Sequence, residues 1–220
     1  MTGIMETEGI IITDEALSRL RERVREYMNG SRYRHTLGVE RACVALGKIY
    51  LPDKIQKLRA AALLHDITKV LSLEKQLQYC RLFDIIYNYG DISSPILLHA
   101  KTASELIKRD FSEFADPEII SAVRWHTTGR RGMSLFDAIV YLADYIEDTR
   151  EYDDCVALRR FFYEELGKDG ADREDVFRRT MVRSFDLTVS NLVAEGRTID
   201  PDTVEARNYY IELISGKEMI

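Results

Sequence analysis

Six side chains of this sequence have the types and settings to bind metal ions together: four histidines and two aspartates. Each histidine lies in a helix-like stretch among apolar or small residues. Asp66 follows the apolar run 60–64 and Asp144 follows the apolar run 138–143. A buried carboxylate is costly unless its charge is compensated, and metal ions would compensate it. The set therefore predicts a site for two first-row metal ions and metal-assisted hydrolysis; its members are His35, His65, Asp66, His99, His126 and Asp144.

Each histidine taken alone has a simpler explanation, because a histidine among apolar helix neighbours is often a core residue with a satisfied hydrogen bond. The joint pattern favours metal binding, since all four fall between residues 35 and 126 on separate predicted helices. Asp144 follows Val140 by four residues on the apolar stripe of its helix and is expected to point inward. Glu147 and Asp148 come next and are expected to be carboxylates on the helix surface.

The rest of the chain reads as a succession of helices. Capping residues and proline starts predict helices that begin after Thr13, Ser31, Ser72, Ser94, Asp116 and Ser134, at Pro52 and at Pro201, with others near 153–166 and 172–195. Asn29-Gly30 is expected to stop the first helix. Because no strand pattern, repeat or linker interrupts this order, we expect one all-α domain over residues 1–220. Its core would span about 14–150, and additional C-terminal helices about 151–220.

Composition limits the classes of partner. Aspartate and glutamate outnumber lysine and arginine by 37 to 31, which argues against a nucleic-acid surface but not against a small phosphorylated substrate bound through metal ions. Cys43, Cys80 and Cys155 form no CxxC pair and are interpreted as reduced thiols. The first residues lack a signal-peptide core, and no apolar run has the length of a membrane span. We therefore expect a cytoplasmic protein without nucleic-acid or membrane partners.

Five stretches carry the candidate ligands in order. They are RYRHTLGV (32–39), AALLHDITK (61–69), LHA (98–100), and RWHTTG (124–129) with YLADYIE (141–147). Together they resemble the motifs of the HD-domain metal-dependent phosphohydrolases, in particular the YqeK-type branch of symmetrical bis(5'-nucleosyl)-tetraphosphatases, with the third stretch the loosest match. The resemblance implies an HD-type helical bundle and a small nucleotide as the substrate.

The resemblance also implies how the metal ligands divide their work. His35, His65, Asp66 and Asp144 would hold one ion, and His99 and His126 would hold the second, with Asp66 bridging the two and serving as a catalytic residue. Imidazole and carboxylate ligands suit several metals. We expect iron first, with manganese, cobalt, nickel or zinc as the alternatives.

Five further residues are candidates for the substrate. Lys69 follows His65 by one helical turn and is expected to contact phosphate and assist catalysis, unless it is an ordinary solvated lysine. Thr127, Thr128 and Gly129 offer hydroxyls and backbone N–H groups after a ligand, although a glycine there is also a common helix cap. Arg150 would add charge at the rim, where arginines are often only solvated.

The implied reaction is the cleavage of diadenosine tetraphosphate into two ADP by a hydroxide shared between the metal ions. Two alternatives stay open. One is an HD phosphohydrolase that acts on another nucleoside phosphate, and the other is a metal-bound HD module that only senses a nucleotide.

Overall fold

The computed structural model describes residues 10–87, 89–93 and 95–216, and these residues form helices and turns without a β-strand. The expected all-α class is confirmed. In chain order the helices are α1 (Asp14–Arg25), α2 (Gly30–Tyr50), α3 (Ile55–Leu64), α4 (Leu73–Leu82), α5 (Tyr89–Ser93), α6 (Leu98–Asp110), α7 (Pro117–Trp125), α8 (Leu135–Ile146), α9 (Asp153–Leu166), α10 (Arg173–Ala194) and α11 (Pro201–Ser215). Short 3₁₀ turns lie at Pro52–Lys54, Pro95–Leu97 and Ser112–Phe114.

Most of these helices begin where their capping residues predicted. The side chains that accept a backbone N–H of the first turn include those of Thr13, Ser72, Asp116, Ser134 and Asp200. Ser134 and Asp137 form a reciprocal capping box ahead of α8. Ser94, the expected cap of the helix with His99, lies outside the described residues, and α6 itself begins at Leu98.

The turn between α1 and α2 differs from the prediction. Helix α1 ends at Arg25, and Asn29 caps α2 by accepting the backbone N–H of Arg32 at 2.9 Å. Gly30 is therefore the first residue of α2 and not the end of α1. The pair Asn-Gly often ends a helix, but asparagine is also among the best N-cap residues. Here Asn29 starts α2 and does not end α1. The earlier start places Arg32 and His35 in the first two turns of α2.

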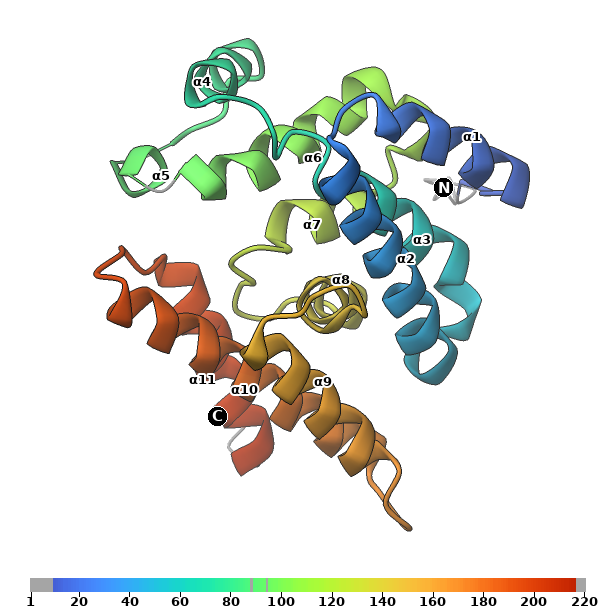
Figure 1. Ribbon diagram of the computed structural model, residues 1–220, viewed down its shortest axis with the longest axis vertical. Helices are drawn as coiled ribbons and strands as arrows, with labels where there is room; N and C mark the ends of the chain where they lie inside the picture. Colours follow the sequence, from blue (N-terminus) through green and yellow to red (C-terminus); the bar gives the residue numbers. More distant parts are fainter. Residues whose placement is uncertain (1–9, 88, 94, 217–220) are drawn as a thin grey trace, which may run out of the picture.

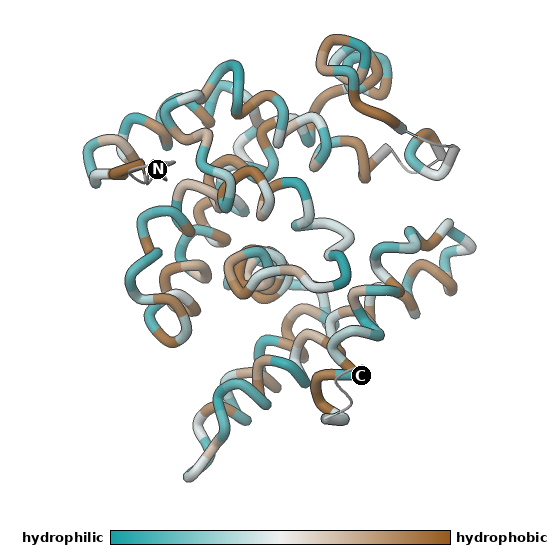
Figure 2. The backbone as a smooth tube through the Cα atoms, turned by 180° about the vertical axis from the view of Figure 1, so that it is seen from behind, coloured by the Kyte–Doolittle hydropathy of each residue, from teal (hydrophilic) through white to brown (hydrophobic). Residues whose placement is uncertain are grey.

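Helices α3 and α8 form the buried centre of the molecule. Every residue of α3 from Ala60 to Leu64 is fully buried, and its consecutive alanines let α1, α2 and α7 pack closely around it. Figure 1 shows α8 end-on between the other helices, and in Figure 2 the same helix is mostly brown. A large apolar side chain that is fully buried contributes roughly 1.5–3 kcal/mol. These two apolar helices bring Asp66 and Asp144 into the interior.

The C-terminal helices α9–α11 lie on the other side of α8 from α2 and α3 (Figure 1). The ring of Phe185 on α10 stacks on Tyr141 of α8 with centroids 4.7 Å apart. One cluster of buried apolar side chains runs from Ile12 to Tyr210 through both parts, although the single domain over residues 1–220 stays a prediction. Within the described residues, no helix has both the length and the apolarity to cross a membrane.

Gly129 is a point where the two parts meet. It lies in the turn after α7 with φ +64°, a conformation that favours glycine. A Cβ at this position would lie 2.8 Å from the ring of Phe185 and 3.2 Å from the Cβ of Ala206. The turn can therefore approach α10 and α11 only because residue 129 has no side chain.

We expect Gly129→Ala to lower the free energy of unfolding by about 2–4 kcal/mol, because a backbone penalty and a steric overlap add. Urea denaturation measures the loss. Gly132→Ala is the matched control, since Gly132 has φ +67° but open space around it. It should lose only about 1–2 kcal/mol. Equal losses in the two variants would contradict the packing role of Gly129.

Candidate metal centre

The four histidines share one arrangement: each has a fixed partner for its Nδ1 atom and turns its Nε2 atom toward a common centre. Three of them lie at helix ends, where Nδ1 meets the backbone carbonyl three residues earlier; the pairs are His65 with Ala62 (2.6 Å), His99 with Ile96, and His126 with Val123 (2.7 Å). His35 on α2 instead has its Nδ1 3.0 Å from Oε1 of Glu147. Because carbonyl and carboxylate oxygens accept, each Nδ1 donates and each Nε2 can present its lone pair.

The Asp66 carboxylate lies between two pairs of imidazoles. Its Oδ2 is 3.3 Å from Nε2 of His65 and 3.8 Å from Nε2 of His35. Its Oδ1 is 3.0 Å from Nε2 of His99 and 3.6 Å from Nε2 of His126. The last two nitrogens are 2.9 Å apart. One carboxylate thus turns a different oxygen to each pair, which is the arrangement required to bridge two ions.

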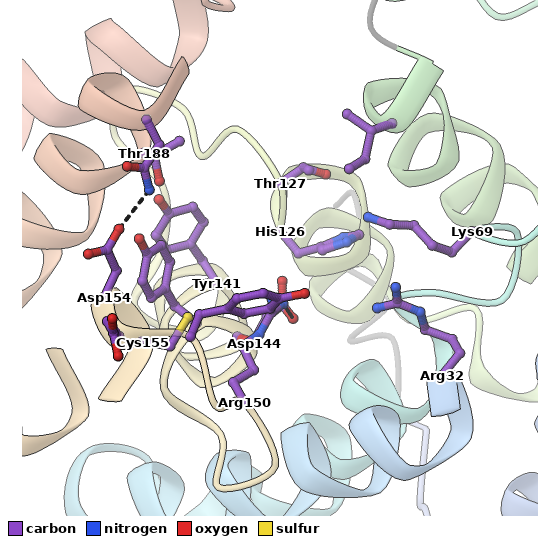
Figure 3. Close-up of a pocket in the computed structure, with 15 residues that line it drawn as sticks. Arg32, Lys69, His126, Thr127, Tyr141, Asp144, Arg150, Asp154, Cys155 and Thr188 are labelled. Carbon is purple, nitrogen blue, oxygen red and sulfur yellow. Dashed lines mark hydrogen bonds and ion pairs between the residues drawn. The ribbon is translucent and has the colours of Figure 1, made fainter. Parts of the chain in front are cut away.

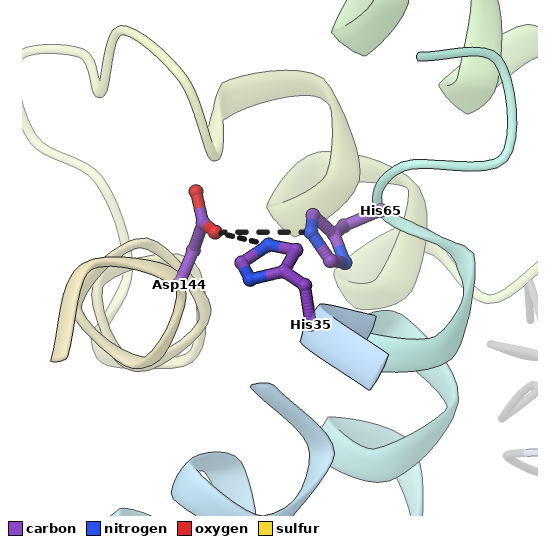
Figure 4. A group of neighbouring side chains, drawn as sticks. All are labelled: His35, His65 and Asp144. Atoms are coloured by element: carbon purple, nitrogen blue, oxygen red, sulfur yellow. Dashed lines mark ion pairs between the residues drawn. The ribbon is translucent and has the colours of Figure 1, made fainter. Parts of the chain in front are cut away.

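Asp144 joins the first pair from α8. Its Oδ1 lies 2.9 Å from Nε2 of His35 and 3.9 Å from Nε2 of His65, and Figure 4 shows these side chains meeting from three separate segments. Donor atoms of these residues all lie within 4.8 Å of one another, as do those of His65, Asp66 and His126. The structure therefore brings together all six residues that the sequence selected.

The donor atoms fit a metal ion. Among the described residues, Nε2 of His35, Nε2 of His65 and Oδ1 of Asp66 are buried without a hydrogen-bond partner. The Nε2 of His35 nevertheless lies 2.9 Å from Oδ1 of Asp144. Buried polar atoms normally have partners. Separations near 3 Å are those of neighbouring ligands around one ion with bonds of about 2.1 Å. Neutral imidazoles and carboxylates are also the donors that divalent first-row ions accept.

Electrostatics favour the ligand forms of His99 and Asp66. Burial, with a contribution from Lys69, lowers the pKa of His99 to about 3 and keeps its imidazole neutral. Burial acts to raise the pKa of Asp66, but His65 and Lys69 outweigh it and hold the pKa well below its usual value. A charged carboxylate and a neutral imidazole therefore lie side by side, ready to share a cation.

Glu147 was expected on the surface, and this prediction was wrong. The residue is 1% exposed, and its Oε1 accepts from Nδ1 of His35 at 3.0 Å and from the hydroxyl of Thr149 at 2.8 Å. It fits against α2 because a Cβ at Gly38 would lie 2.0 Å from Oε2 of Glu147. Burial acts to lower the pKa of His35, but Asp144 and Glu147 raise it to about 9. The two carboxylates thus favour a positive charge at this ring, whether a proton or a metal ion carries it. The sequence signal was Gly38, one helical turn after His35.

Two arginines hold the aspartates from outside. Arg32 donates from Nη1 to Oδ2 of Asp66 at 2.8 Å. Arg150 donates to the Asp144 side chain and to its backbone carbonyl, both at 2.6 Å. Arg150 was a sequence candidate, whereas Arg32 was missed. Its signal was the position three residues before His35, on the same face of the helix.

Lys69 lies inside the centre. Its side chain is 18% exposed, and its Nζ is 3.2 Å from Nε2 of His99 and 3.9 Å from Oδ1 of Asp66. Burial lowers its pKa, and the attraction of Asp66 opposes this effect. The structure thus places Lys69 where it can meet a bound phosphate and not on an open surface.

The centre opens into a cavity of about 690 Å³. Figure 3 shows Lys69 and Arg32 on one side of it and residues of α9 and α10 on the other, so the C-terminal helices supply a wall that the sequence did not reveal. Thr127 lines the cavity, and its buried hydroxyl has no hydrogen-bond partner in the part of the chain that the structure describes. The hydroxyl of Thr128 donates to the backbone carbonyl of Gly129. Thr128 and Gly129 do not line the cavity.

Known proteins share this fold and sequence pattern. A profile of the HD domain matches residues 32–149, and the chain belongs to the HD domain family. The symmetrical bis(5'-nucleosyl)-tetraphosphatase of Halalkalibacterium halodurans is 32% identical over 84% of this chain and 91% of its own length. The protein of the same name from Bacillus subtilis is 28% identical over 92% of this chain and 98% of its own length.

A solved structure of an HD superfamily protein shares the fold of this chain. It is described as a predicted HD superfamily hydrolase involved in NAD metabolism from Clostridium acetobutylicum. It superposes with a TM-score of 0.77 at 30% identity and covers 92% of this chain and 100% of its own. HD-domain hydrolases bind divalent metal ions, and the histidine and aspartate groups described above can hold them.

We expect Glu147→Gln to weaken metal binding about 10- to 100-fold, because a neutral amide no longer supports the charge and orientation of the His35 ring. Competition with a chromophoric chelator measures the affinity. Asp148→Asn is the matched control, because Asp148 is exposed and pairs with Arg41. The control should bind metal as the wild type does. An unchanged affinity in a well-folded Glu147→Gln protein would rule out this role.

Proposed function

We propose that this protein is a metal-dependent hydrolase that cleaves diadenosine tetraphosphate at its centre and releases two ADP. The observation that carries the proposal is the Asp66 carboxylate between two imidazole pairs, beside a cavity with cationic side chains. The names of the relatives from Halalkalibacterium halodurans and Bacillus subtilis support the choice of substrate.

The proposed ligand assignment follows the two oxygens of Asp66. One ion would be held by His35, His65, Asp66 and Asp144, and the second by His99, His126 and Asp66. We propose iron as the native metal, because imidazole and carboxylate donors suit it. The cysteines Cys43, Cys80 and Cys155 are buried and form no disulfide, which supports a cytoplasmic location.

Divalent ions held by these donors supply an activated water near neutral pH and Lewis acidity at the phosphate oxygens. The chain binds and orients the substrate. Arg32 and Arg150 keep unused N–H groups after their contacts with Asp66 and Asp144, and guanidinium groups bind phosphate well. Lys69 adds an ammonium group on the side of the second imidazole pair.

The covalent change is a hydrolysis between the two central phosphates. Water adds to one central phosphorus, and the bond from this phosphorus to the bridging oxygen breaks. The other ADP leaves with that oxygen, and the neighbouring cations stabilise the negative charge that develops there. Thr127 is the member of the 127–129 turn that lines the cavity, and its buried hydroxyl has no hydrogen-bond partner within the described residues, so we propose it as the phosphate contact from this turn.

Chromatography of the early products tests the proposal. We expect the metal-loaded protein to convert diadenosine tetraphosphate to ADP alone. Asp66→Asn should lose more than tenfold in kcat, at least about 1.4 kcal/mol of transition-state stabilisation, because an amide cannot supply the bridging charge. Circular dichroism checks its fold, and Asp148→Asn should keep the wild-type rate.

Two results would contradict the proposal. AMP and ATP as products would mean that the attack falls one phosphate away from the centre. Binding of the dinucleotide to the metal-loaded protein without any turnover would indicate a nucleotide sensor.

A further inference from the structure

A second cavity adjoins the metal centre. Its volume is about 730 Å³, close to the 690 Å³ of the first. The two cavities share Arg32, Arg150 and Tyr152 in their linings. Two of these shared residues are the arginines that contact the aspartates of the centre, so the cavities meet where the proposed reaction takes place.

The second cavity is lined by arginine side chains with N–H donors that could bind an anion. Arg34 lines it and is exposed, and no ion pair or hydrogen bond engages Arg34 within the described residues. Arg32 uses only Nη1 on Asp66, and Arg150 uses Nε and Nη2 on Asp144, whereas a guanidinium group carries five N–H donors. Unused guanidinium donors therefore line both the junction and the second cavity.

Two carboxylates, those of Glu147 and Glu151, line the second cavity together with these arginines. The carboxylate of Glu147 accepts from His35 and Thr149, and Glu151 is exposed and forms no ion pair with Arg34 within the described residues. Tyr152, which is 72% exposed at the start of α9, offers an aromatic ring at the junction. Guanidinium donors beside an open aromatic ring are groups that can bind the phosphates and the base of a nucleotide.

We propose that the second cavity binds the other nucleoside diphosphate half of the dinucleotide, with Arg34 contacting its phosphates. This inference rests on the proposed function. The substrate has two identical halves, and each cavity has the volume of a small-molecule site. When one half occupies each cavity, the middle of the phosphate chain lies at Arg32 and Arg150, beside Asp66 and Asp144. Two phosphates then lie on each side of the aspartates, and this placement explains cleavage at the centre of the phosphate chain.

Steady-state kinetics of Arg34→Ala test the inference. We expect KM for diadenosine tetraphosphate to rise about tenfold, the effect of losing one charge-assisted hydrogen bond, with kcat changed less than about twofold. Arg34→Lys should recover part of the loss because it keeps the charge without the planar fork. The matched control is Arg81→Ala, because Arg81 on α4 is also exposed but lines neither cavity.

Calorimetric titration of the metal-loaded proteins with ADP gives a readout that does not need turnover. We expect two ADP molecules per chain in the wild type and in Arg81→Ala, and a weakening of one of the two sites in Arg34→Ala. An unchanged KM together with unchanged ADP binding in Arg34→Ala would overturn the inference. Failure of the proposed function is a separate result, since the wild type itself would then not cleave the dinucleotide.

Discussion

The site depends on the burial of one negative charge, that of Asp66. Its side chain is 2% exposed, so its charge has to be balanced by neighbouring groups and not by water. Arg32 balances it from one side, and two imidazole pairs face its two oxygens from the others. A single carboxylate thus faces both imidazole pairs with different oxygens, the geometry that would let it bridge two ions.

Two parts of the chain hold this arrangement in place. At helix ends, a backbone carbonyl three residues earlier orients each ring of His65, His99 and His126. Glu147 orients the ring of His35. The C-terminal helix α9 acts on the other side of the centre. Arg159 on α9 donates to the backbone carbonyls of Ile146, Glu147 and Arg150, and so it fixes the loop that carries the partners of His35 and Asp144. The C-terminal helices therefore support the centre as well as forming a wall of its cavity.

Local signals predicted the helices and the six ligand candidates, because caps act within one turn and a charged side chain beside an apolar run must find compensation. Other features depend on which distant segments pack together, and local signals do not report this. Glu147 reaches His35 only because Gly38 leaves room on another helix. Gly129 packs against Phe185, 56 positions further along the chain, and the local sequence did not report this contact. Arg32 stood in a motif, but its contact with Asp66 needs the observed packing of α2 on the end of α3.

The most direct test of the central claim is anomalous X-ray diffraction from crystals of the protein loaded with Mn²⁺. We expect two anomalous peaks, one between His35, His65 and Asp144 and the other beside His99 and His126. Each peak should lie within bonding distance, about 2.0–2.3 Å, of a different oxygen of Asp66. A single peak, or two peaks without contact to Asp66, would contradict a bridging carboxylate.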